Sequence, residues 1–99
     1  MSDLAVSEVT AIPRRSTPER TQPESAGRIL IIDDEAEIRE SLETLLELEG
    51  YTVAVAGSGR EGLAHIGQRS FDVVLLDLAL PDKNGMDVLA EIRVHGFQL

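Results

Sequence analysis

The 99-residue sequence contains no cysteine, which excludes a disulfide framework and a thiolate metal site. It also lacks an apolar run long enough to span a membrane, and its N-terminus has nothing like the hydrophobic region of a signal peptide. These absences are typical of a protein in a reducing compartment. We therefore expect a cytoplasmic location and no membrane partner.

Basic residues are scarce in most of the chain. Residues 29–99 carry five lysines and arginines against fourteen acidic residues, whereas residues 1–28 carry four of each kind. The formal net charge of −9 therefore comes from the longer segment alone. Because such a surface repels nucleic-acid phosphates, the charge disfavours direct nucleic-acid binding and favours a basic protein partner or a metal cation.

The first 27 residues differ in composition from the rest. They mix serine, threonine, proline, glutamate and arginine, and their apolar residues follow no amphipathic period. This pattern is typical of disorder. We expect residues 1–27 to be a disordered leader that contributes nothing to the fold, and residues 28–99 to form the single domain that this length allows.

Three apolar strands alternate with helical patterns after the leader. A continuous apolar run predicts a strand at residues 29–32, and segments rich in apolar and β-branched residues predict strands at 51–56 and 71–76. Right-handed crossover connections place parallel strands of this kind in the order 2-1-3. The sequence therefore predicts an α/β fold, a doubly wound parallel sheet with the element order βαβαβα.

A helix is predicted after each strand. Asp34 and Ser58 each precede a glutamate by three residues, the spacing of a capping box, and Gly50 and Gly96 are natural C-terminal stops. The apolar faces of the three helices are predicted to consist of Ile38, Leu42, Leu45, Leu46, Leu63, Ala64, Ile66, Met86, Leu89, Ala90 and Ile92.

Carboxylates follow the first and third predicted strands. Because these strands are neighbours in the 2-1-3 order, Asp33, Asp34 and Asp77 should meet at the carboxyl edge of the sheet. Clustered carboxylates repel one another, and a cation relieves the repulsion. Mg²⁺ fits best, since it needs only one or two carboxylates, and the chain has no EF-hand spacing for Ca²⁺. The absence of a glycine-rich Walker loop disfavours a nucleotide-binding fold.

Asp77 is the single acid at the end of the third strand, a position that suits a nucleophile in phosphoryl transfer. Asp72 and Asp82, by contrast, are interpreted as a surface residue and a turn residue.

Two segments of this sequence resemble the acidic signatures of the response-regulator receiver domain of two-component signalling. Residues 29–35 read ILIIDDE, and residues 77–85 read DLALPDKNG, with proline four positions and glycine eight positions after the first aspartate. Both motifs occur at the expected separation, with helical patterns between them, and this combination is specific.

The resemblance implies roles for four residues. Asp77 would accept a phosphoryl group from a sensor histidine kinase or a phosphotransfer protein. Asp33, Asp34, Asp77 and the backbone carbonyl of Ala79 would hold Mg²⁺. The chain would then be a signalling module rather than an enzyme, with at most self-phosphorylation and autodephosphorylation at Asp77.

A complete receiver has five strands and five helices, so the resemblance predicts a flavodoxin-like fold that is incomplete after the third helix. Residues 73–76 would then present an unpaired edge, which invites self-association. Two alternatives stay open. The chain could be a non-switching interaction module, or a magnesium-dependent aspartyl phosphatase, although Ala79 occupies the position where such phosphatases usually have a second aspartate.

Overall fold

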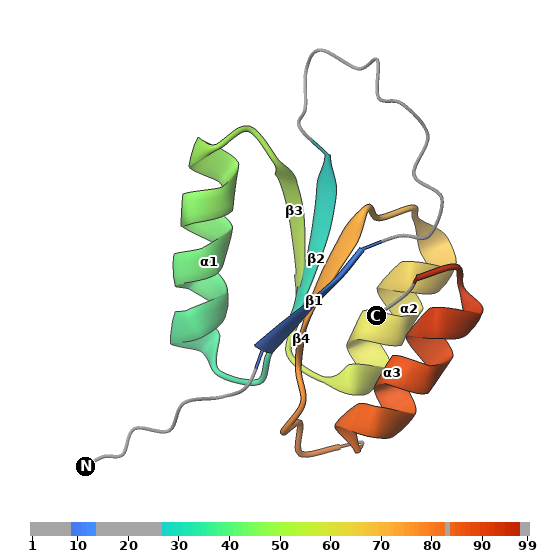
Figure 1. The fold of residues 1–99 in the computed structure, drawn as a ribbon. Coiled ribbons are helices and arrows are strands. Elements are labelled where there is room, and N and C mark those ends of the chain that lie inside the picture. Colours follow the sequence, from blue (N-terminus) through green and yellow to red (C-terminus); the bar gives the residue numbers. More distant parts are fainter. Residues whose placement is uncertain (1–8, 14–26, 83, 98–99) are drawn as a thin grey trace.

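A computed structural model describes residues 9–13, 27–82 and 84–97 of the chain. Strands and helices alternate along most of this part (Figure 1). In chain order, the elements are β1 (Val9–Pro13), β2 (Arg28–Ile32), α1 (Ala36–Leu48), β3 (Thr52–Ala56), α2 (Gly59–Gln68), β4 (Val73–Asp77) and α3 (Gly85–Val94).

The strands form one sheet in the order β1-β4-β2-β3. β2 pairs in parallel with both β3 and β4, which confirms the predicted 2-1-3 arrangement of the three parallel strands. β1 extends the sheet by pairing antiparallel with β4. The carboxyl ends of β2 and β4 therefore lie side by side, as a site at this edge requires.

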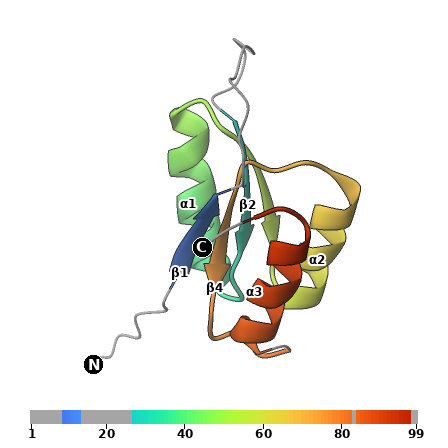
Figure 2. The same ribbon diagram turned by 45° about the vertical axis from the view of Figure 1, so that its right-hand side comes forward.

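Helices cover both faces of the sheet. α1 lies on one face against β2 and β3, and α2 and α3 lie together on the other (Figures 1 and 2). The main core fills the space between the sheet and the α2–α3 pair. Its fully buried side chains include Ile12, Leu30, Ile32, Val74, Leu76, Val88, Ile92 and Phe97.

Strand β1 contradicts the prediction that residues 1–27 form a disordered leader without a role in the fold. Within that leader, residues 9–13 pair with β4 from Val9 opposite Asp77 to Pro13 opposite Val73. Ile12 has no exposed surface. Residues 1–8 and 14–26 lie outside the described residues.

The pairing of β1 has a local explanation and one consequence. Val9, Thr10 and Ile12 have high strand propensity, and a proline at the end of an edge strand removes no essential hydrogen bond. Because β1 occupies the outer side of β4, the predicted unpaired edge at residues 73–76 is wrong, and it gives no reason to expect self-association there.

The predicted helix ends are largely confirmed. Ser58 is the N-cap of α2 and accepts the N–H of Glu61, while Gly50 and Gly96 both have φ +98° just beyond helix ends. The capping box predicted at Asp34 is wrong, because Glu35 is the N-cap of α1 and makes no side-chain cap bond.

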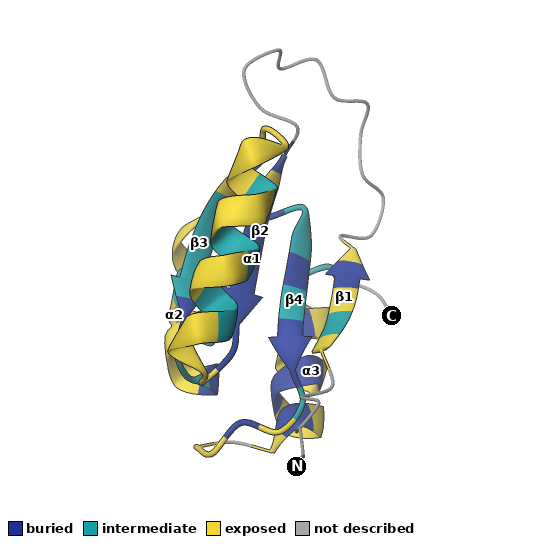
Figure 3. Cartoon of the chain, turned by 90° about the vertical axis from the view of Figure 1, so that its left-hand side faces the viewer, coloured by how far each residue is buried: buried dark blue, intermediate teal, exposed yellow. Residues whose placement is uncertain are grey.

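Four residues of the predicted apolar faces are exposed, and two of them, Ala64 and Ala90, are small. Leu45 on α1 is 59% exposed and Met86 on α3 is 63% exposed. No residue of α1 is buried, because this helix covers its side of the sheet without a neighbouring helix among the described residues, and its outer surface faces solvent (Figure 3). None of the described helices is long and apolar enough to cross a membrane.

Two interior glycines of α2, Gly62 and Gly67, should respond to alanine with opposite signs. A Cβ at Gly62 would collide with the side chain of Ile32 on β2, whereas nothing lies within 4 Å of a Cβ at Gly67. We expect Gly67→Ala to raise the free energy of unfolding by up to about 1 kcal/mol through helix propensity. Gly62→Ala should lower it. Urea unfolding of both variants tests this, and a stabilised Gly62→Ala protein would contradict the close packing of α2 on β2.

Candidate functional site

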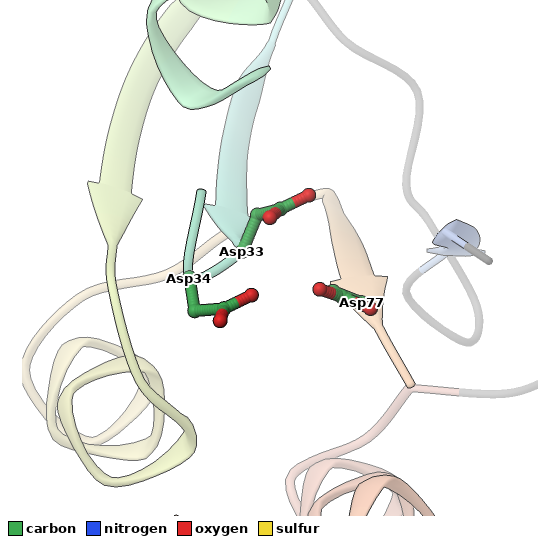
Figure 4. Close-up of side chains that lie close together, drawn as sticks. All are labelled: Asp33, Asp34 and Asp77. Atoms are coloured by element: carbon green, nitrogen blue, oxygen red, sulfur yellow. The ribbon is translucent and has the colours of Figure 1, made fainter. Parts of the chain in front are cut away.

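Three carboxylates meet at the carboxyl edge of the sheet, as the sequence predicts. Asp33 and Asp34 directly follow β2, and Asp77 is the last residue of β4. One oxygen from each residue lies within 4.8 Å of the others, and Asp34 and Asp77 point toward each other across the gap (Figure 4). Asp33 and Asp77 are buried, whereas Asp34 is exposed.

The two buried aspartates share a local hydrogen-bond pattern. Asp33 Oδ1 accepts the N–H of Glu35 at 2.9 Å, and Asp77 Oδ1 accepts the N–H of Ala79 at 2.9 Å. In each case a short polar side chain bonds its own backbone two residues further on, a turn that aspartate favours. One oxygen of each carboxylate is thereby fixed, so the second is held in a defined direction.

The remaining oxygen of Asp33 lacks a partner. Asp33 Oδ2 is buried and has no hydrogen bond among the described residues. Buried polar atoms almost always have a partner, and the binding of an ion is one common explanation of an exception. A hard cation with oxygen ligands fits this carboxylate set.

Electrostatics at Asp77 point the same way. Burial raises the pKa of Asp77 above its ordinary value, and the negative charges of Asp33 and Asp34 raise it further, although the Ala79 N–H lowers it. A cation would counteract the like-charge repulsion. The N–H of Ala79 binds Asp77, whereas the predicted metal ligand is the carbonyl oxygen of the same residue. That metal-binding role stays a prediction.

Arg39 on α1 is a residue beside the site that the sequence analysis did not select. Its guanidinium donates to the backbone carbonyl of Asp33 at 2.8 Å. The same group lies 3.2 Å from the position that a Cβ of Gly57 would occupy. Arg39 therefore binds the turn that carries Asp33 and Asp34 and lies beside the loop after β3.

Gly85 has a steric role beside the site. A Cβ at this position would collide with the backbone of Leu78, the residue after Asp77. The start of α3 therefore packs directly on the loop that leaves Asp77. This contact explains why glycine stands eight residues after the predicted acceptor.

Asp82 is exposed in the loop after β4, as its interpretation as a turn residue predicts, and Asp72 is half-buried just before β4, but both carboxylates also make hydrogen bonds that the sequence did not predict. Asp72 Oδ2 accepts the N–H of Arg28 at 2.8 Å, at the start of β2. Asp82 accepts the N–H groups of Gly59 and Arg60 at 2.9 and 3.1 Å, at the start of α2. Both acids join segments far apart in the chain, and no local sequence signal indicates such contacts.

A doubly wound sheet with an acidic cluster at its switch point is the architecture of the receiver class, and comparison with known families gives the same result. The sequence pattern of the response regulator receiver domain matches residues 29–99. The chain therefore belongs to the response-regulator receiver domain family of two-component signalling.

Similar proteins and similar solved structures support this family assignment. The alginate biosynthesis transcriptional regulatory protein AlgB of Pseudomonas aeruginosa is 46% identical over 75 residues, which are 76% of this chain and 17% of that protein. A CheY-like receiver domain protein from Methanospirillum hungatei superposes with a TM-score of 0.67 at 41% identity, over 71% of this chain and 57% of that one.

A third similar protein was solved with ligands of the kind expected here. Response regulator TrrA of Thermotoga maritima, in complex with Mg²⁺-BeF, has a TM-score of 0.65 at 42% identity, over 68% of this chain and 58% of that one. TrrA was also solved in complex with the histidine kinase ThkA. This chain thus spans less than a fifth of AlgB and somewhat over half of the two solved receivers.

Proposed function

We propose that Asp77 accepts a phosphoryl group from a sensor histidine kinase or phosphotransfer protein, with Mg²⁺ held by Asp33, Asp34, Asp77 and the carbonyl of Ala79. The observation that carries this proposal is the convergence of the three carboxylates to within 4.8 Å at the ends of two neighbouring parallel strands. The complexes of TrrA with Mg²⁺-BeF and with a kinase support it by similarity.

The hydrogen bonding of Asp77 suggests which atom reacts. Oδ1 accepts the Ala79 N–H, so we assign the attack on phosphorus to Oδ2. A new Oδ2–P bond would form as the phosphorus–nitrogen bond of the donor histidine breaks, and the departing imidazole would take up a proton. Bound Mg²⁺ supplies charge neutralisation for the phosphoryl oxygens, while the chain holds the reacting carboxylate in place.

The proposed class is a signalling receiver rather than an enzyme acting on a separate substrate. The acidic charge of residues 29–99 supports a protein partner over direct nucleic-acid contact. Membership of the receiver family supports a cytoplasmic location.

A second candidate function is binding without phosphorylation. Leu45 and Leu48 on α1 are 59% and 77% exposed, which leaves apolar surface on this helix for a protein partner. An aspartyl phosphatase has no such support, because Ala79 lacks the carboxylate that would act as its second acid.

The test is incubation of the 99-residue protein with acetyl phosphate and Mg²⁺, followed by intact-mass measurement. We expect one phosphoryl adduct that hydroxylamine removes, because acyl phosphates are labile to this reagent. Asp77→Asn should give no adduct, and Asp87→Asn, at an exposed acid in the first turn of α3, should give the wild-type amount. An adduct that persists in Asp77→Asn would refute the assignment. An unmodified wild-type protein that still binds a kinase would favour the second function.

A further inference from the structure

Asp82 lies in the loop between β4 and α3, five residues after Asp77. Its two carboxylate oxygens bond separately to the backbone N–H groups of Gly59 and Arg60, at 2.9 and 3.1 Å. These two residues are the first of α2 and lie 23 and 22 positions earlier in the chain. A side chain from the loop that follows Asp77, here called the acceptor loop, thus forms hydrogen bonds with helix α2.

The contact completes the start of α2. The first four N–H groups of a helix have no partner within the helix. In α2, Asp82 binds those of Gly59 and Arg60, and Ser58 Oγ binds that of Glu61. The regular helical pattern then begins with the Gly62 N–H, which donates to the carbonyl of Ser58. The positive end of the helix dipole favours a carboxylate at this position.

The same loop is fixed at two other points. Near its start, the Ala79 N–H bonds to Asp77, and at its end Gly85 packs on the backbone of Leu78. Both contacts are internal to the segment from β4 to α3. Asp82 supplies a link to the other half of the site, because α2 packs on β2, the strand that leads to Asp33.

A second contact continues this link. The loop between β3 and α2 contains Gly57, whose N–H donates to Glu61 at 2.9 Å and beside which Arg39 lies. Arg39 in turn holds the carbonyl of Asp33. The turn at residues 57–60 is therefore bonded to the loop after the proposed acceptor and lies beside the arginine that binds the loop of the proposed metal ligands.

We propose that Asp82 is a positioning residue for the acceptor site: by binding the start of α2, it holds the loop after Asp77 so that Ala79 keeps its place beside the carboxylates. The Ala79 N–H would then stay on Asp77 Oδ1, and the Ala79 carbonyl would stay available to a cation. The effect of Asp82 on metal binding and phosphorylation rests on the proposed function of the site.

The experiment compares Asp82→Asn with Asp87→Asn in the whole chain. Each variant removes one negative charge, from the acceptor loop or from the first turn of the following helix, so a general field effect should be similar in both. Asparagine at position 82 keeps one acceptor oxygen but places an NH₂ group against a backbone N–H. Residues that orient metal ligands typically change metal affinity by about 10–100-fold when mutated.

We expect Asp82→Asn to speed hydrogen exchange at the Ala79 amide relative to the wild type. It should also weaken Mg²⁺ binding by about tenfold, measured from amide chemical shifts. In Asp87→Asn, the Ala79 amide should exchange at the wild-type rate. The Mg²⁺ affinity of this variant should stay within about twofold of the wild-type value, because solvent and salt screen an exposed charge. If Asp82→Asn only lowers the melting temperature while Ala79 exchange and Mg²⁺ affinity match those of Asp87→Asn, Asp82 is no more than a helix cap and the inference is overturned.

The two proposals can fail separately. Hydrogen exchange at Ala79 needs neither metal nor phosphodonor, so it tests the hold of Asp82 on the loop in any case. A wild-type protein without phosphorylation would refute the proposed function, whereas unchanged Ala79 exchange in Asp82→Asn would refute the positioning role.

Discussion

Ile12→Ala should lower the free energy of unfolding by about 2–4 kcal/mol, the range for large-to-small changes in a core. The side chain has no exposed surface and lies opposite Val74 in the register of β1 with β4. Val74 is also the partner of Leu30 in β2, so Ile12 extends a row of core residues across the sheet. Chemical denaturation followed by circular dichroism measures the loss.

Val9→Ala is the matched control in the same strand. Val9 is 39% exposed, so this variant should change the free energy of unfolding by no more than about 0.5 kcal/mol. Deletion of residues 1–13 should have a larger effect, because it uncovers the outer edge of β4 and invites pairing with another chain. Sedimentation would then detect self-association. A monomeric deletion protein with wild-type stability would show that β1 is dispensable.

The sequence predicts the features that depend on local pattern. The apolar run before Asp33 and the one before Asp77 each have the length and composition of a buried parallel strand. The handedness rule then makes β2 and β4 neighbours, and their acids must meet at one edge. The location of the carboxylate cluster therefore follows from strand ends and one topological rule.

Features that depend on long-range contacts are not predicted. β1 is short and stands among proline, serine and arginine, so its alternation of half-buried Thr10 and buried Ile12 is weak evidence without the β4 edge beside it. The contacts of Asp82 and Arg39 could not be predicted for the same reason. An acid in a turn and an arginine on a helix are ordinary in sequence, and only the fold brings them to the start of α2 and the carbonyl of Asp33.

The carboxylate cluster should reduce the stability of the metal-free protein at neutral pH, and Asp77→Asn should restore it. Burial, together with Asp33 and Asp34, raises the pKa of folded Asp77 above the ordinary value of 3.8. The folded state therefore takes up a proton at a higher pH than the unfolded state does. The stabilisation from this protonation is complete below the ordinary pKa and is lost as the pH rises through the folded pKa.

We expect Asp77→Asn to be more stable than the wild type at pH 7 in EDTA, by on the order of 1 kcal/mol. The difference should shrink as the pH falls toward the ordinary pKa of an aspartate. Excess Mg²⁺ should stabilise the wild type more than the variant, because a ligand that binds only the folded state raises its stability. Asp87→Asn serves as the control, since it removes the same charge from an exposed position. Urea unfolding at several pH values, with EDTA or Mg²⁺, measures all of these differences. An Asp77→Asn protein that is less stable than the wild type in EDTA at pH 7 would mean that the carboxylate is stabilised by its surroundings, and the argument for a cation at this edge of the sheet would lose its electrostatic basis.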